Sequence, residues 1–145
     1  MTLMRAAVII IDSGKVALIR RVRGDEVYYL VPGGGVEPGE TPQEAAIREV
    51  REEFGLVVRL DWLVATVEFK GNEQHYYLGT VTGGEFGSGT GEELRFGSDS
   101  PSGSYTPVWM NLDELADRDV RPRAVVGVIR SGQLGNHLLP LRIVE

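Results

Sequence analysis

The 145-residue chain contains no cysteine, which excludes disulfide bonds, thiolate nucleophiles and cysteine-based zinc sites. Its two histidines, His75 and His137, lack zinc-ligand spacing. The longest apolar run, residues 6–11, is far shorter than the roughly 20 residues that a membrane helix needs. From these absences we expect a reducing, cytoplasmic location and no membrane partner.

Positive charge is also scarce, since 21 acidic residues outnumber 15 basic ones and give a net charge of -6. This balance argues against stable binding to nucleic acid, which depends on a cationic surface. Thirteen of the basic residues are arginines, whose planar guanidinium suits phosphate, so the composition is compatible with binding of small phosphorylated ligands. The length and the 42% apolar content predict a single domain over residues 1–145.

Apolar patterning predicts an α/β fold in which helices flank a mixed sheet. Pro32 and the glycines at 33–35 are expected to end the third strand, and residues 83–104, with seven glycines and five serines, to form a long loop or lid. The expected strands are 5–11, 15–22, 28–31, 56–69, 74–82 and 105–110, and the expected helices are 41–54, 112–116 and 123–130.

The helix expected at 41–54 has clear signals at both ends. Thr41 is the predicted N-cap, Pro42 occupies the first helical position and Glu44 completes a capping box. Gly55 is expected to end the helix at C′. The face predicted to pack against the sheet consists of Ile47, Val50 and Phe54, with Ala46 at its edge.

Three glutamates, Glu49, Glu52 and Glu53, are spaced so that they share a separate stripe of this helix. Negative charges repel each other there and are disfavoured near a helix C-terminus. A hard divalent cation would remove the conflict, because Mg2+ prefers carboxylate oxygen. The alternative is a solvated acidic face, with neighbouring arginines as ordinary helix partners.

Residues 34–56 resemble the Nudix box, and every specified position of that motif is matched. The matching residues are Gly34, Glu40, Arg48, Glu49, Val50, Glu52, Glu53, Gly55 and Leu56. The resemblance to this MutT-like family implies an α/β/α sandwich. It also implies hydrolysis, dependent on Mg2+ or alternatively Mn2+, of a diphosphate linkage in a nucleoside diphosphate joined to another moiety.

The same resemblance implies roles for residues of the box. Glu49, Glu52 and Glu53 would be catalytic metal ligands, with the Gly34 carbonyl as a further ligand. Arg48 would hold the glutamates in position and count among the catalytic residues. Glu40 and Gly55 would be structural, the first bracing the loop and the second ending the helix.

Outside the box the candidates rest on position in the chain. Arg21 and Arg23, at the end of a strand before the glycines, are expected to meet phosphates, and Tyr29 to stack on a base. The proton of the attacking water would go to a box glutamate, Glu53 or Glu49, or to a distal base in the long loop. The candidates for that distal base are Glu92 and Glu93.

The leading interpretation is therefore a pyrophosphohydrolase acting on a small nucleotide. Nucleoside triphosphates, dinucleoside polyphosphates and nucleotide sugars remain open as substrates. The alternative is a catalytically silent Nudix-fold module that binds or senses nucleotides, although such modules usually have a damaged box. Nudix domains also often form homodimers, for which the strand 56–69 offers an edge.

Overall fold

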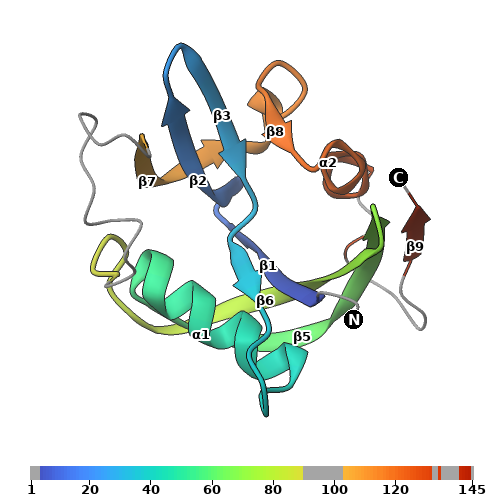
Figure 1. The fold of residues 1–145 in the computed structure, drawn as a ribbon. Coiled ribbons are helices and arrows are strands. Elements are labelled where there is room, and N and C mark those ends of the chain that lie inside the picture. The colour runs from blue at the N-terminus through green and yellow to red at the C-terminus, as the bar shows by residue number, and fades with distance from the viewer. Residues whose placement is uncertain (1–3, 90–102, 132–133, 135–140, 145) are drawn as a thin grey trace.

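The computed structural model describes residues 4–89, 103–131, 134 and 141–144. The strands in these ranges form a mixed sheet of order β8-β3-β2-β1-β6-β5-β9, in which β4 also pairs with β1 and β7 with β2 (Figure 1). None of the helices in these ranges is long and apolar enough to cross a membrane. The elements are β1 (Met4–Asp12), β2 (Lys15–Arg23), β3 (Glu26–Leu30), β4 (Gly33–Gly35), α1 (Pro42–Phe54), β5 (Leu56–Phe69), β6 (Asn72–Gly84), β7 (Ser104–Asn111), the 3-10 helix η2 (Leu112–Glu114), β8 (Val120–Arg121), α2 (Arg123–Arg130) and β9 (Leu141–Val144).

Strand β1 is buried on both faces, as its sequence predicts. Val8 and Ile10 point to one face and pack in a cluster with the buried side of α1. Ala7 and Ile9 point to the other face and join a cluster that contains the buried side of α2. The two helices therefore cover opposite sides of a mixed sheet, which confirms the predicted α/β fold with flanking helices.

The buried face of α1 differs in one position from the prediction. Ala46, Val50 and Phe54, spaced four residues apart, are fully buried, and Ala45 is buried beside them. Ile47 is 37% exposed, so its assignment to the packed face was wrong. Ala46, Val50 and Phe54 share one face of the helix, and Ile47, which follows Ala46, is rotated about 100° away from that face. Ala45 is small, so the helix backbone can lie close to the sheet.

Residues 33–35 form a strand, although the sequence predicts that they interrupt one. Strand β4 pairs antiparallel with β1, with Ala6 opposite Gly34 and Ala7 opposite Gly33. Glycines carry no side-chain pattern from which a strand can be predicted. The short strand β9 was also not predicted, and it pairs with β5 from Ala65 to Glu68, which covers part of the edge considered for a homodimer.

The beginning of the expected loop 83–104 is docked on the end of α1. The backbone N–H of Gly87 donates to the carbonyl of Phe54 at 2.9 Å. The Phe86 ring lies between two aromatic rings, with its centroid 5.5 Å from that of Phe54 and 5.2 Å from that of Trp109. Residues 90–102 lie outside the described part of the chain, so the lid remains a prediction.

Candidate active site

Helix α1 begins and ends at the predicted residues. The Thr41 hydroxyl accepts a hydrogen bond from the Glu44 backbone at 3.1 Å, and the Glu44 carboxylate accepts one from the Thr41 backbone at 2.9 Å. Gly55 has a φ of 77°, which favours glycine, and its N–H donates to the Arg51 carbonyl at 2.9 Å. These caps fix the length of the helix that carries the box glutamates.

Arg48 lies at the centre of the polar network on α1. Its Nε and Nη2 donate to the two carboxylate oxygens of Glu40, at 2.8 and 3.0 Å, and Nη2 also donates to the Gly35 carbonyl at 3.0 Å. Its Nη1 donates to Glu49 at 2.9 Å and to Glu52 at 3.3 Å. One guanidinium therefore ties strand β4 and the following loop to two of the three box glutamates.

These hydrogen bonds shift the ionisation of both central partners. The hydrogen bond from Arg48, together with a smaller contribution from the backbone hydrogen bond of Glu37, lowers the pKa of Glu40 to about 2. In return, the hydrogen bond to Glu40 raises the pKa of Arg48 above its usual range, with a further contribution from Glu49. The pair is therefore fully charged at any pH at which the enzyme would work.

Gly34 makes room for one of the box glutamates. A Cβ atom at position 34 would overlap the carboxylate of Glu49, so a side chain here would require that carboxylate to move. The Glu49 side chain is only 13% exposed and is held in this place by Arg48. The box glycine thus serves to seat Glu49 against the backbone of β4.

The three box glutamates do not converge on one point. Arg48 lies between Glu49 and Glu52, whereas Glu53 faces a cavity. Across the described ranges, no three acidic or histidine side chains are close enough together to hold a metal ion. The spacing of the glutamates predicts a shared stripe, but it does not reveal that an arginine occupies the space between two of them.

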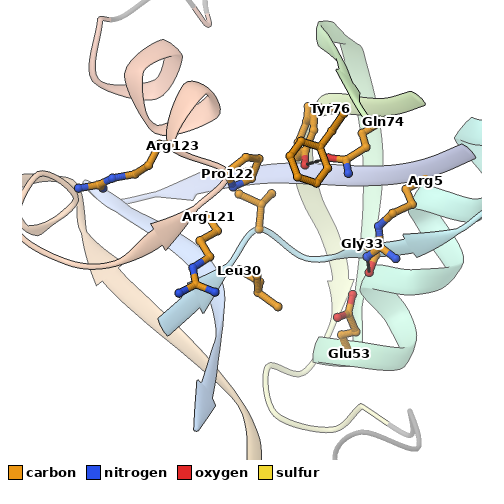
Figure 2. Close-up of a pocket in the computed structure, with 11 residues that line it drawn as sticks. Arg5, Leu30, Gly33, Glu53, Gln74, Tyr76, Arg121, Pro122 and Arg123 are labelled. Atoms are coloured by element: carbon orange, nitrogen blue, oxygen red, sulfur yellow. Dashed lines mark hydrogen bonds between the residues drawn. The ribbon is translucent and has the colours of Figure 1, made fainter. Parts of the chain in front are cut away.

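A cavity of about 390 Å3 opens beside Glu53, between β1 and β6 on one side and β3 and β8 on the other. In Figure 2, Glu53 points from α1 toward the cavity, Arg5 reaches toward Gly33, and Arg121 enters from the opposite side. The described residues that line it are Arg5, Leu30, Val31, Gly33, Glu53, Phe69, Gln74, Tyr76, Arg121, Pro122 and Arg123.

Sequence reasoning missed the three arginines of this cavity, Arg5, Arg121 and Arg123. They come from β1, from β8 and from the first position of α2, and β1 is distant in sequence from the other two and meets them only in the folded chain. One signal was available, since Arg5 interrupts the apolar pattern at the beginning of a strand whose central residues, 6–10, are buried. No comparable signal marks Arg121 or Arg123.

The arginines and the tyrosine proposed for substrate binding lie elsewhere. Arg21 is 6% exposed, and its guanidinium lies 3.8 Å from the centre of the Tyr105 ring. Arg23 is exposed at the end of β2, where it pairs in register with Glu26. Tyr29 lines a separate hollow with Arg20, Trp109 and Arg118. The candidate distal bases, Glu92 and Glu93, lie outside the described residues.

Comparison with known proteins agrees with this architecture. A model of the NUDIX domain matches residues 1–128. A Bacillus subtilis protein assigned as an 8-oxo-dGTP diphosphatase is 35% identical over 81 residues, which cover 54% of this chain and 52% of that protein. The RNA pyrophosphohydrolase of Erythrobacter litoralis is 30% identical over 117 residues, or 68% of this chain and 64% of that one. This chain thus spans about half to two thirds of the length of these relatives.

The solved structures show the same fold. An ADP-ribose pyrophosphatase from Streptococcus suis superposes with a TM-score of 0.72 over 98% of this chain and 99% of its own, at 17% sequence identity. The family model covers most of the chain, including the intact box and the cavity beside it from Arg5 to Arg123. On this evidence, the chain belongs to the Nudix hydrolase family.

Proposed function

We propose that this chain is a divalent-metal-dependent pyrophosphohydrolase that cleaves a diphosphate linkage in a nucleoside diphosphate joined to another group. The observation that carries the proposal is the position of Glu53. This carboxylate from the end of α1 lines a cavity together with Arg5, so one site combines a carboxylate with a guanidinium, a group suited to binding phosphate. Nudix hydrolases generally use divalent metal ions, and we propose Mg2+ or Mn2+ here.

The residues around Glu53 fit a hard cation in their chemistry. Glu49, Glu52, Glu53 and the Gly34 carbonyl offer only oxygen atoms, which Mg2+ and Mn2+ prefer. The absence of a side chain at Gly34 leaves space that the Glu49 carboxylate fills. We propose that these four residues would hold the ion, although the three carboxylates are not gathered around one point in this structure. When bound, a divalent cation neutralises charge on the diphosphate and lowers the pKa of a coordinated water molecule.

The chain's own residues would then orient the reaction. Water attacks one phosphorus in line, a new P–O bond forms, the bond from that phosphorus to the bridging oxygen breaks, and the second phosphate leaves with the electron pair. We propose that Glu53, which lines the cavity, or Glu49 accepts the proton of the attacking water, with Glu92 or Glu93 of the long loop as the alternative base. Arg48 would hold Glu49 and Glu52 in place through its hydrogen bonds to both carboxylates.

The names of two relatives support a nucleotide-type substrate. An 8-oxo-dGTP diphosphatase and an RNA pyrophosphohydrolase are both similar in sequence to this chain. With a net charge of -6, this chain fits a small nucleotide better than a long nucleic acid. We therefore propose nucleoside triphosphates, dinucleoside polyphosphates and nucleotide sugars as the classes to test.

The test is a hydrolysis screen of these three classes with Mg2+, with Mn2+ and with EDTA. The products are identified, and reaction in 18O-labelled water shows which phosphorus is attacked. Turnover of one class that requires the metal and places the label in a phosphate product would support the proposal. Nucleotide binding without turnover of any class would instead support a catalytically silent sensing module.

A further inference from the structure

Three arginines line the cavity beside Glu53, but they differ in how their charge is compensated. Arg123 donates to the backbone carbonyls of Leu115, at 3.3 Å, and Arg118, at 3.0 Å, and in Figure 2 it points away from the other side chains of the cavity. Its role is to hold the segment that precedes α2. The two arginines that remain for ligand recognition are therefore Arg5 and Arg121.

The in-plane donors of Arg121 are already engaged by carboxylates. Its Nε and Nη2 donate to the two oxygens of Asp119, at 3.1 and 2.9 Å, and its Nη1 lies 3.7 Å from Glu26. The hydrogen bond from Arg121 lowers the pKa of Asp119, which is consistent with a persistent ion pair. A guanidinium with two carboxylate partners has little net charge left for phosphate.

One flat face of the same guanidinium is also covered. The Arg121 Cζ atom lies 3.9 Å from the centre of the Tyr28 ring, and Tyr28 is itself buried. Asp119 and Glu26 contact the edges of the Arg121 guanidinium, and Tyr28 covers one of its faces. The opposite face is therefore the one that remains for a ligand in the cavity. A rigid, flat guanidinium of this kind is suited to stack on an aromatic ring.

Arg5 has the opposite properties. It donates a long hydrogen bond from Nη2 to the Gly33 carbonyl, at 3.5 Å. No carboxylate in the described ranges forms an ion pair with it. In the sheet, Arg5 stands opposite Gln74 on β6 and Gly35 on β4, so it lies on the side of the cavity next to the Nudix box. Its charge is therefore available to a phosphate group.

We propose, on the basis of the function proposed above, that Arg5 binds the phosphates of the substrate and that Arg121 is a stacking platform for an aromatic base. The two arginines divide recognition between them. The cavity thus selects a nucleotide through its base at one end and its diphosphate at the other. A phosphorylated compound without an aromatic ring would use Arg5 alone.

The test compares two ligands that cannot be cleaved, both in the presence of Mg2+. One is a methylene-bridged nucleoside triphosphate, and the other is methylenediphosphonate, which carries a bridged diphosphate and no base. Calorimetry gives the affinity for the first, and displacement of the first gives the affinity for the second. The variants are Arg121→Ala, Arg121→Lys, Arg5→Ala and Arg5→Lys. Thermal unfolding confirms that each is folded, and Arg121→Lys keeps a charge beside Asp119.

Arg59→Ala is the matched control. Arg59 donates to Asp61 at 3.1 Å, and these two residues are two positions apart on a strand, as Asp119 and Arg121 are two apart in the chain. Arg59 is exposed and does not line the cavity. Its removal therefore costs a similar ion pair without altering the proposed site.

Loss of a stacked base predicts that both Arg121 variants bind the nucleotide analogue at least about fivefold more weakly and leave diphosphonate affinity nearly unchanged. Loss of a charge-assisted hydrogen bond predicts that Arg5→Ala weakens both ligands about tenfold or more, and that Arg5→Lys retains part of the affinity. Arg59→Ala should bind both ligands as the wild type does.

Three results would overturn the proposal. They are restoration of nucleotide affinity by Arg121→Lys, an equal loss of both ligands in Arg121→Ala, and unaltered binding in Arg5→Ala. Failure of diphosphonate to displace the analogue from the wild type would contradict the phosphate site. Because binding is measured without turnover, normal binding results with no hydrolysis would contradict only the proposed catalytic function.

Discussion

The guanidinium of Arg48 binds the carboxylate of Glu40 through two hydrogen bonds, from Nε at 2.8 Å and from Nη2 at 3.0 Å. These residues are eight positions apart and lie on either side of the helix N-cap. The pair therefore joins the loop after β4 to the second turn of α1, and the remaining donors of Arg48 reach Glu49 and Glu52. The box arginine thus acts as a positioning residue.

Replacement of Arg48 by lysine tests this role. A lysine keeps the charge but cannot bridge Glu40 and Glu49 at once, because its donors lie on one nitrogen. We expect kcat to fall about tenfold or more, with a smaller change in KM, because the carboxylates of Glu49 and Glu52 would no longer be held in place. Steady-state kinetics of Arg48→Lys would show this. Arg51→Lys is the control, because Arg51 is an exposed arginine of the same helix. Equal kinetics in the two variants would contradict the role.

The pKa of Glu40 predicts how stability responds to acid. Folding lowers this pKa from 4.5 to about 2, so the stabilisation is complete above 4.5 and is lost as the pH falls toward 2. Glu40→Gln lacks this ionisation. We expect its Tm to lie below that of the wild type by a constant amount at neutral pH, and the difference to shrink between pH 4.5 and 2. A difference that stays the same throughout that range would refute the assignment.

Gly34 and Gly35 provide a matched pair of positions for testing whether Gly34 makes room for the Glu49 carboxylate. A Cβ at position 34 would overlap the Glu49 carboxylate, whereas a Cβ at position 35 would have no atom within 4 Å. Displacement of a reacting group by about 1 Å can cost about 100-fold, so we expect kcat of Gly34→Ala to fall by that order. Gly35→Ala keeps the carbonyl that Arg48 uses and should remain active. Similar kcat values in the two variants would rule out this role of Gly34.

The Phe86 ring between Phe54 and Trp109 predicts a stability effect. Truncation of a partly buried aromatic that stacks on two rings should lower the free energy of unfolding by about 2 to 3 kcal/mol, as measured with urea. Phe69 is 38% exposed, and Phe69→Ala should cost less than about 1 kcal/mol. If both variants unfolded at the same urea concentration, the segment after β6 would not be docked on α1 in solution.

Local signals predicted the helix that carries most of the box, although not the short strand β4 at its beginning. Thr41, Pro42, Glu44 and Gly55 act within a few residues of themselves, so the limits of α1 were evident from the sequence. The same is true of β1, whose apolar residues on both faces indicate a central strand. The family motif further identified the glutamates and the arginine of the network.

The substrate side of the site could not be predicted in this way. The cavity arginines come from β1, β8 and the first position of α2, and their proximity depends on the strand order β8-β3-β2-β1 and on the turn from β8 into α2. Arg21 was proposed because it lies near the glycines in sequence, but alternation along β2 places its side chain against Tyr105. The ion pair between Asp119 and Arg121 also cannot be predicted from the composition or from hydrophobic periodicity.

The most direct test of the central claim is kcat for Glu53→Gln with Mg2+ and the best substrate from the screen. Glu114→Gln is the control, because Glu114 is a half-buried glutamate of η2 that pairs with Arg118 and does not line the cavity. If Glu53 acts at the reacting phosphate, kcat should fall about 100-fold or more in Glu53→Gln and remain unchanged in Glu114→Gln. Full activity of folded Glu53→Gln would contradict the assignment of catalysis to this cavity.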